Sequence, residues 1–346
     1  MRFDTGPSPQ WRAPGTVAAM MRTVVLALVP ALLAHVWFYG AGILVNAGIA
    51  LVAGLATEAA CLRLTGKPVG RFLTDGSTLV TAVLYAFCLP PLCPWWVTVT
   101  GMVFAIGIVK HAYGGLGYNP FNPAMAACAL VLVTFPAAMA RWTAPDIGDL
   151  DYARPTVAAT ITYALAGSLP AGTGVDAIAR PTTLALAREG LGLSRTMDEI
   201  QAGPAFGDFG GAGWEWIGNF TAIGGFALLL LGVIRWHTPA GVLGGLLTCA
   251  TLAWLLDPDT HPSPGFHLFS GGAILGAFFI ATDPVSSPAT ARGRLVYGAG
   301  IGVLTWLIRA FGSYPDGVAF AVLAMNMGVP LIERYTRPRV YGRPRA

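Results

Sequence analysis

The feature of this sequence that most constrains its fold is a series of long apolar stretches, divided by short polar turns, along most of its 346 residues. A helix needs about 20 mostly apolar residues to cross the hydrocarbon core of a bilayer. Ten segments approach that pattern, at 18–38, 41–62, 77–89, 95–110, 121–139, 217–234, 240–256, 266–281, 295–311 and 317–332. The sequence therefore predicts an all-α polytopic membrane protein with about ten transmembrane helices.

Composition supports this prediction and excludes other classes. Apolar residues make up 55% of the chain and charged residues only 11%, whereas soluble domains carry about 25% charged residues. The net charge of +4 is small, so we expect membrane lipid and no nucleic acid as a partner. The segments 77–89 and 266–281 are short and flanked by Gly and Pro, which favours broken helices there.

The basic residues predict the orientation in the membrane, because short cytoplasmic loops are rich in Lys and Arg. With a cytoplasmic N-terminus, nearly all basic residues outside the long connection fall at the inner ends of the predicted spans. The short outer connections Tyr39–Gly40, Leu89–Pro94 and Asp257–Gly265 carry none, and Arg309 is the one exception. We therefore expect both termini in the cytoplasm of a bacterial cell and the long connection in the periplasm, around the inner membrane.

This topology divides the chain into four parts. They are a first membrane half with five spans (1–139), a periplasmic loop (140–216), a second membrane half with five spans (217–333) and a basic cytoplasmic tail (334–346). Within the loop, Thr156–Leu169 is a candidate short helix or hairpin, and a helix is expected to begin at Pro181.

A weak internal similarity relates the two halves. Asp75-Gly76-Ser77 opens the third span as Ser270-Gly271-Gly272 opens the eighth, and Tyr118-Asn119-Pro120 precedes the fifth as Tyr314-Pro315-Asp316 precedes the tenth. Five spans per half would give the halves opposite topology, so the pattern predicts two inverted five-helix repeats with a site between broken helices. The competing interpretation is a coincidence of Gly and Pro positions.

Few ionisable residues lie at membrane depth, and such residues are functional candidates by default. Glu58 lies in the second span and Asp283 at the mouth of the eighth, where both are candidates for an ion path. The alternative places them at the membrane interface, snorkelling or capping helix ends. In the Asn-Pro segment that follows the fourth span, Asn119 and Asn122 offer side-chain oxygens to an ion or to a polar ring edge; a plain re-entrant turn is the alternative.

The five Cys include no C-x-x-C pair and are interpreted mainly as buried packing thiols, so no metal site is predicted.

A set of motifs spread over nearly the whole chain resembles a known family. They include Gly114-Gly115-Leu116-Gly117-Tyr118-Asn119-Pro120-Phe121-Asn122-Pro123, Leu275-Gly276-Ala277-Phe278-Phe279-Ile280-Ala281-Thr282-Asp283-Pro284 and Tyr314-Pro315-Asp316-Gly317-Val318. Together they look like the RnfD family of the Rnf ion-translocating electron-transport complex, which is related to NqrB of the sodium-pumping NADH:quinone reductase. The match is weakest between 145 and 215.

The resemblance implies a flavoprotein whose FMN phosphate is esterified to a threonine of the long loop. The family pattern is close to D-x-x-[ST]-[GA]-A-T-P-L, in which Asp176 matches the Asp, Thr182 the modified Thr and Leu184 the Leu. Ala179, Arg180 and Pro181 depart from it, as does Thr183, which replaces the Pro and is the second choice for the flavin. Arg180 beside the acceptor is positioned to offset phosphate charge.

The resemblance also implies the function and the partners. The chain would relay electrons between ferredoxin and NAD while Na⁺ or H⁺ crosses the membrane, together with Rnf subunits A, B, C, E and G. A periplasmic flavin transferase would attach the FMN, and a noncovalent riboflavin is compatible with the family. Two alternatives remain, a stand-alone inverted-repeat transporter or channel and the homologous NqrB protein of the quinone reductase.

Overall fold

The computed structural model describes residues 16–146, 156–168, 179–314 and 316–337. These residues are mostly helical, and the elements of the first half follow one another through short turns. They are α1 Val17–Tyr39, α2 Gly42–Leu64, α3 Val69–Leu73, α4 Ser77–Phe87, α5 Trp95–Val103, the π-helix η1 Phe104–His111, α6 Pro123–Thr134 and α7 Pro136–Met139. η1 continues α5 without a break, so the fourth predicted span is one continuous helix whose C-terminal part is π-helical.

The described residues of the long connection, 140–146, 156–168 and 179–213, form a small two-stranded sheet and three short helices. They are β1 Trp142–Thr143, α8 Val157–Ala166, β2 Ala179–Arg180, α10 Thr183–Gly192 and α11 Met197–Gln201. β1 and β2 pair antiparallel, with Trp142 opposite Arg180. The candidate element at 156–169 contains the helix α8 Val157–Ala166, and Leu169 lies outside the described residues. The helix expected at Pro181 begins at Thr183 with Thr182 as its N-cap.

The second half contains two helix pairs separated by an interrupted helix. Its elements are α12 Trp214–Leu230, α13 His237–Leu256, α14 Pro264–Phe269, α15 Ala273–Leu275, the π-helix η2 Gly276–Ile280, α16 Ala291–Phe311 and α17 Val318–Thr336. Ser270, Gly271 and Gly272 lie between α14 and α15, and Gly271 has a left-handed φ of 68°. The eighth predicted segment is thus a broken helix, because a residue with positive φ ends the α-helical path.

Each of the ten predicted segments contains helix, but the helices differ in length. Among the described residues, five are long and apolar enough to cross a membrane: α1, α2, α13, α16 and α17. α4 has 11 residues and α6 has 12, which is short of the roughly 20 that a full span needs. The chain is a helical membrane protein, whereas the number of ten spans and the inverted repeat stay predictions.

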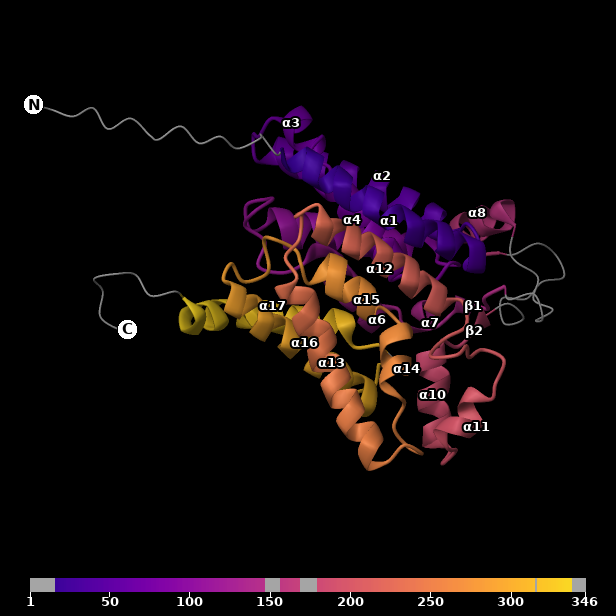
Figure 1. The fold of residues 1–346 in the computed structure, drawn as a ribbon. Helices are drawn as coiled ribbons and strands as arrows, with labels where there is room; N and C mark the ends of the chain where they lie inside the picture. The colour runs from indigo at the N-terminus through magenta and orange to yellow at the C-terminus, as the bar shows by residue number, and fades with distance from the viewer. Residues whose placement is uncertain (1–15, 147–155, 169–178, 315, 338–346) are drawn as a thin grey trace, which may run out of the picture.

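Helices far apart in the sequence pack side by side. Figure 1 shows α1 beside α12 and α13 beside α16, and the two helices of each pair contact each other along their length. Glycines allow α13 and α16 to approach closely: a Cβ on Gly302 would collide with the carbonyl oxygen of Val242, and one on Gly245 would collide with that of Ala299. Small residues at a helix contact are typical of membrane bundles.

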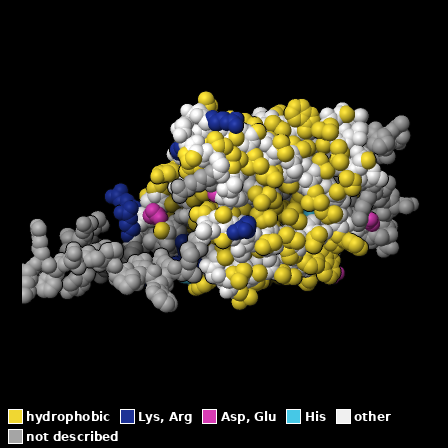
Figure 2. All heavy atoms as spheres, turned by 90° about the horizontal axis from the view of Figure 1, so that it is seen from above, with side chains coloured by type: hydrophobic (Ala, Val, Ile, Leu, Met, Phe, Trp, Pro, Cys, Tyr) yellow, Lys and Arg dark blue, Asp and Glu magenta, His cyan; other side chains and the backbone are white. Residues whose placement is uncertain are grey.

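The molecule has two ends of different character. The start of α1 and the end of α17 lie on the same side of the bundle, while α8, α10, α11 and the β1–β2 pair lie on the opposite side (Figure 1). Figure 2 shows hydrophobic side chains covering most of the visible face between them. Leu26, Leu33 and Trp37 of α1 are each more than 60% exposed, as expected of a helix that faces lipid.

Candidate functional site

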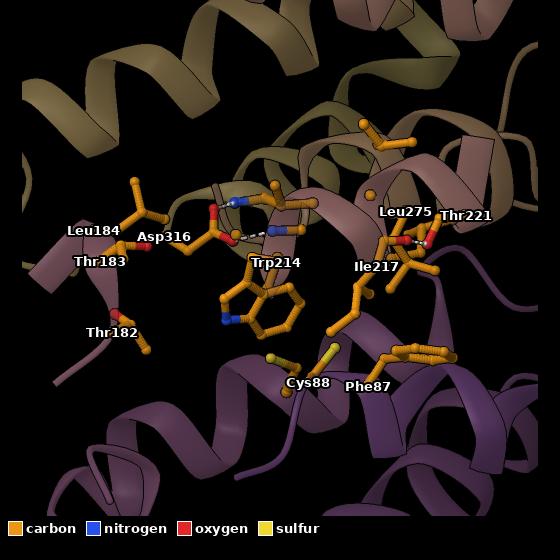
Figure 3. A pocket seen from close by; sticks show the side chains of 18 of the residues that line it. Phe87, Cys88, Thr182, Thr183, Leu184, Trp214, Ile217, Thr221, Leu275 and Asp316 are labelled. Carbon is orange, nitrogen blue, oxygen red and sulfur yellow. Dashed lines mark hydrogen bonds between the residues drawn. The ribbon is translucent and has the colours of Figure 1, made fainter. Parts of the chain in front are cut away.

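The predicted flavin threonine lies at a cavity between the two halves of the chain (Figure 3). This space of about 150 Å³, here named the Thr182 cavity, is enclosed by the end of α4, by α6, by the first turn of α10, by α12 and by the residues around α15. Its walls are mostly apolar and aromatic, and the few polar side chains include Thr182, Thr183, Thr221 and Asp316. A concave apolar pocket with few polar groups is typical of a cofactor site.

Thr182 occupies the N-cap position of α10. Its backbone is extended, and its hydroxyl oxygen accepts a hydrogen bond of 3.3 Å from the backbone N–H of Ala185. The side chain is only partly buried, and it lines both the Thr182 cavity and an adjoining pocket of about 100 Å³. Because the first N–H groups of a helix are unpaired and its dipole is positive there, this position favours a phosphate group.

Thr183, the second candidate, is much less accessible. Its side chain is only 6% exposed, and a Cβ on Gly211 would lie 2.7 Å from its hydroxyl oxygen. The loop before α12 therefore packs against Thr183, and both threonines line the two pockets.

Of the two charged residues of the predicted flavin motif, the structure describes Arg180 and not Asp176. Arg180 lies in β2 beside Thr182, is exposed, and lines the adjoining pocket; its Nη1 donates to the carbonyl oxygen of Ala179 at 3.1 Å. Asp176 lies outside the described residues.

A group of aromatic rings extends from Thr182 toward the bundle interior. Trp142 and Trp214 line both pockets, with ring centroids 5.5 Å apart. Trp214 also contacts Tyr39 and the fully buried His35, and His35 contacts Phe87 at 5.9 Å. Sequence patterns did not predict this cluster. The tryptophans at either end of the long connection are its local signal, and their meeting depends on the tertiary fold.

Asp316 lines the Thr182 cavity beside Leu184 and holds the broken helix. Its carboxylate accepts hydrogen bonds from Gly272 N–H (2.8 Å), from Val318 N–H (3.3 Å) and from Arg309 (3.1 Å). The Arg309 guanidinium also donates to the carbonyl oxygens of His267 (2.5 Å) and Ser270 (3.0 Å). Arg309, the exception in the charge pattern, is therefore a buried structural residue, and its charge is paired inside the protein.

Other candidate residues at membrane depth lie at a different cavity from Thr182. Asn119, Asn122, Lys110 and Asp283 all line a space of about 190 Å³, here named the Asp283 cavity. Asp283 accepts hydrogen bonds from Val285 N–H (3.1 Å) and from the Ser286 hydroxyl (2.9 Å). The two asparagines thus line the same cavity as Asp283 and lie apart from Thr182.

The asparagines have different partners. Asn122 caps α6, its backbone N–H donates to Asn326 of α17 at 3.1 Å, and its side chain donates to the carbonyl oxygen of Ile280 at 3.4 Å. Asn122 therefore joins the two halves. Asn119 donates to Phe121 (3.0 Å), but its side-chain oxygen is buried without a hydrogen-bond partner among the described residues.

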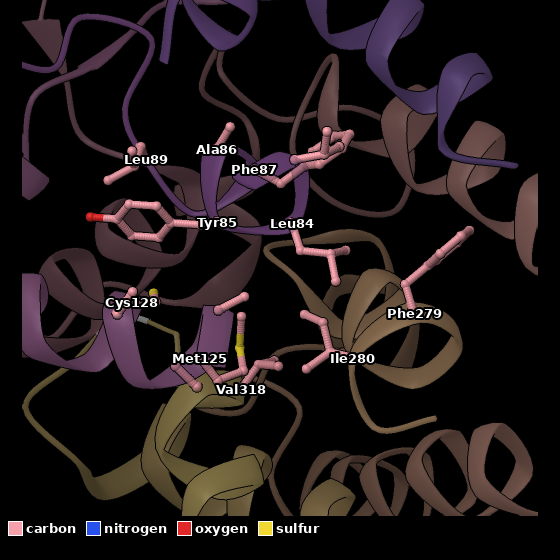
Figure 4. Packing of buried hydrophobic residues seen from close by; sticks show 14 of the residues in the cluster. Leu84, Tyr85, Ala86, Phe87, Leu89, Met125, Cys128, Phe279, Ile280 and Val318 are labelled. Carbon is pink, nitrogen blue, oxygen red and sulfur yellow. The ribbon is translucent and has the colours of Figure 1, made fainter. Parts of the chain in front are cut away.

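An apolar layer separates the two cavities (Figure 4). Phe87, Met125 and Ile280 line the Thr182 cavity on one side of it. Leu84 and Phe279 line the Asp283 cavity on the other side. All five side chains belong to one hydrophobic cluster and are at most 5% exposed. The candidate residues therefore lie at two cavities, which are separated by apolar side chains from α4, α6 and η2.

Glu58 is fully enclosed and paired. Its side chain is 1% exposed, and one carboxylate oxygen lies 2.6 Å from Lys110 Nζ and 3.3 Å from His111 Nε2, while Thr78 donates to the other. Lys110 also donates to the Ser77 hydroxyl at 2.7 Å. Glu58 does not snorkel to water, because a side chain with so little exposure cannot reach it. The π-helical turns of η1, a feature common at functional sites, carry both basic partners.

Comparison with known proteins matches this chain over its whole length. The family model of the NQR2, RnfD, RnfE family matches residues 4–342. The D component of the ion-translocating oxidoreductase complex of Pseudomonas aeruginosa is 49% identical, covering 100% of this chain and 98% of its own length. Proteins with the same description in Aeromonas salmonicida and Escherichia fergusonii are 48% and 44% identical, covering 93% and 99% of this chain and 94% and 99% of their own lengths.

Proposed function

Because the chain belongs to the NQR2, RnfD, RnfE family and is a subunit of an Rnf-type ion-translocating electron-transport complex, we propose that it carries electrons on an FMN esterified to Thr182. The observation that carries this proposal is the position of Thr182. It is the accessible N-cap of α10 and lines a largely apolar cavity between both membrane halves.

The residues around Thr182 suit a phosphoester. The unpaired N–H groups at the start of α10 would stabilise the phosphate charge, and Arg180 on β2 lines the same pocket as Thr182. The wall residues Trp142, Trp214 and Phe87 give the cavity an apolar and aromatic lining, which suits a planar ring. A bound flavin supplies one- and two-electron transfer, which side chains alone do not perform.

The Asp283 cavity is proposed to hold a noncovalent riboflavin. Asn119 offers a buried side-chain oxygen that lacks a partner among the described residues, and Asn122 presents a second amide to the same space. An uncharged flavin needs such hydrogen-bonding groups and no phosphate site. The apolar layer of Leu84, Phe87, Met125, Phe279 and Ile280 would then separate two flavins at a distance that only electrons cross.

Ion movement is proposed to involve Asp283 and Glu58. Asp283 faces the Asp283 cavity directly, and Glu58 reaches it through Lys110, which lines that cavity and contacts Glu58. Carboxylates at membrane depth are typical of ion and proton pathways. The coupling ion is Na⁺ or H⁺, and the electrons pass between ferredoxin and NAD through the other subunits, A, B, C, E and G.

The proposed membrane arrangement has ten spans in two inverted halves of a bacterial inner-membrane protein. The termini face the cytoplasm, and Thr182 faces the periplasm, where a flavin transferase would reach it. The arrangement of α10, α11 and the β1–β2 pair on one end of the molecule supports this view, since α1 begins and α17 ends at the other.

Mass spectrometry of the intact chain tests the flavin assignment. We expect the wild type, produced with a flavin transferase, to weigh more than its amino acids by one FMN less one water. The band should also fluoresce on a denaturing gel. The near-isosteric Thr182→Val variant should lose both signals, whereas Thr183→Val, which changes the covered neighbour in the same way, should keep them.

A folding control is needed, because Thr182→Val also removes an N-cap worth about 1 kcal/mol. Co-purification of each variant with its partner subunits provides that control. An intact complex containing Thr182→Val that still carries covalent FMN would contradict the assignment. Transport of ions by the purified chain without partners would instead favour the stand-alone transporter.

A further inference from the structure

A third cavity, separate from both candidate flavin sites, lies between α10 and the neighbouring ends of α14 and α16. It measures about 250 Å³ and shares only Leu184 with the lining of the Thr182 cavity. We name it the Arg188 cavity. Its polar side chains are two arginines, two histidines and one threonine: Arg188, Arg309, His261, His267 and Thr260.

Two polar atoms in this lining are buried without a hydrogen-bond partner among the described residues. They are Nη1 of Arg188 and Nδ1 of His267, and the His267 side chain is only 4% exposed. An unsatisfied donor on a buried charged group costs free energy, more than it would for a neutral group. No Asp or Glu is among the described residues that line the cavity, so an acceptor for Arg188 has to come from elsewhere.

Arg309 lines the cavity, but its guanidinium N–H groups already donate to other protein groups. Its guanidinium is occupied by Asp316 and by the carbonyl oxygens of His267 and Ser270. These bonds fix the backbone at His267 and neutralise Arg309 through Asp316. Arg188 is therefore the positive charge in the cavity that can pair with an anion.

The remaining lining is apolar and continues onto the surface that faces lipid. Trp306 and Phe311 line the cavity near the end of α16, with ring centroids 5.8 Å apart, and Phe311 is 73% exposed. Leu252 and Leu256, at the end of the neighbouring α13, are 59% and 86% exposed. Tryptophan and other aromatic side chains concentrate at the membrane–water interface, so a molecule in this cavity would have a polar end and an apolar end.

We propose that the Arg188 cavity binds the phosphate of an anionic membrane phospholipid. Arg188 donates to the phosphate oxygens, a pairing that the fork of a guanidinium favours, and His267 adds a second polar contact. The acyl chains lie against Trp306, Phe311 and the ends of α13 and α16. Inorganic phosphate has the same charged group but would leave the apolar wall unused.

The site would connect the membrane surface to the candidate flavin helix. Arg188 and Thr182 belong to the same short helix, since Thr182 caps α10 and Arg188 lies within it. A lipid held by Arg188 would thus restrain α10 against α14 and α16. This consequence does not require that Thr182 carries a flavin.

The test is native mass spectrometry of the complex purified in detergent, from which the full chain is released with its bound lipid. Probes are phosphatidylglycerol, phosphatidylcholine and inorganic phosphate. We expect one retained phosphatidylglycerol and little phosphatidylcholine on the wild type. Arg188→Gln should lower phosphatidylglycerol occupancy by about 10-fold or more, because a charge-assisted hydrogen bond contributes about 1.5–3 kcal/mol.

Arg195→Gln is the matched control. Arg195 follows α10 in the same loop, is exposed, and does not line the cavity, so its loss should leave retention unchanged. Should Arg188→Gln fail to assemble, the wild type alone still decides: its melting temperature should rise with phosphatidylglycerol and not with phosphatidylcholine.

Three results would overturn the proposal. Equal retention of phosphatidylglycerol and phosphatidylcholine by the wild type would show that the cavity does not recognise anionic lipid. Equal retention of phosphatidylglycerol by the wild type and by Arg188→Gln would remove Arg188 from the site. Stabilisation by inorganic phosphate equal to that by phosphatidylglycerol would identify a free-phosphate site.

Discussion

At the scale of single residues, the polar side chains fall into two groups. Some pair with each other in the interior, and others line a cavity. Lys110 and Glu58 neutralise each other in the interior, with a 2.6 Å contact. Thr182 keeps its hydroxyl at the rim of a cavity, and Asp283 faces the Asp283 cavity with two hydrogen bonds. The proposed chemistry uses the available groups, and the paired ones hold them in place.

The Lys110–Glu58 pair provides a test of this distinction. Lys110→Met leaves a buried carboxylate without its cation, and breaking a buried pair in this way costs about 3–5 kcal/mol. We expect a large loss of thermal stability in Lys110→Met and in Glu58→Gln, and a smaller loss in the double variant. Thermal unfolding of all four proteins in one detergent gives the coupling. Additive losses would show that the two side chains do not act as a pair.

The burial of Asp283 predicts that the stability of the protein depends on pH. Burial raises the pKa of its carboxyl above the ordinary value of an aspartate, so the folded state holds the proton more tightly than the unfolded state. Its contribution to stability is therefore present at low pH and is lost as the pH rises through the raised pKa. Asp283→Asn, which stays neutral, should be more stable than the wild type at alkaline pH, with the difference shrinking toward acid pH. A difference in melting temperature that is constant with pH would contradict this.

At the scale of elements, the broken helix formed by α14, α15 and η2 positions the cavity. Gly271 turns the chain with a φ of 68°, and the Asp316 carboxylate accepts the N–H of Gly272 that the break leaves unpaired. Arg309 binds the carbonyl oxygens on the other side of the break. Unpaired backbone groups at membrane depth are tolerated only where protein groups satisfy them, and these two side chains do so.

Neighbouring glycines in the break should differ in their tolerance of alanine. A Cβ on Gly271 would lie 2.6 Å from an Asp316 oxygen and 2.6 Å from Leu184, at a φ that side chains rarely adopt, whereas one on Gly272 would lie 3.5 Å from Asp316. We expect Gly271→Ala to lose more than about 1 kcal/mol of stability and to reduce flavin attachment. Gly272→Ala should keep both its stability and its flavin attachment. Equal melting temperatures of the two variants would show that the turn does not depend on Gly271.

At the scale of the whole molecule, two halves of the chain enclose two cavities with an apolar layer between them. Asn122 links the start of α6 to η2 and α17. The elements of the long connection lie at one end of the bundle and the start of α1 at the other. The electron transfer proposed between two flavins would therefore cross this apolar layer.

Cysteine labelling tests the proposed orientation. In a background with the five native cysteines replaced, Arg195→Cys should react in intact cells with a maleimide that cannot cross the inner membrane. Arg63→Cys, exposed at the end of α2, should react only after the membrane is made permeable. A permeant maleimide labels both and serves as the control. The reverse pattern would place the long connection in the cytoplasm and remove Thr182 from a periplasmic transferase.

Hydropathy, which is a local property, was enough to locate the helices. Each of the ten apolar segments contains helix, and Pro and Thr before Leu184 indicated the start of a helix near Thr182. The short third segment and the interrupted eighth also followed from Gly and Pro. These features depend on a few neighbouring residues, because the bilayer selects helix and turn residues end it.

Only the tertiary structure decided which of these residues meet. It paired Glu58 with Lys110, set Asp316 against Gly272, and put Asn122 and Asp283 in one cavity while leaving Thr182 in another. Each contact joins elements from distant parts of the chain. Their approach depends on helix packing and on small residues at the contacts, which no local pattern of hydropathy or charge encodes.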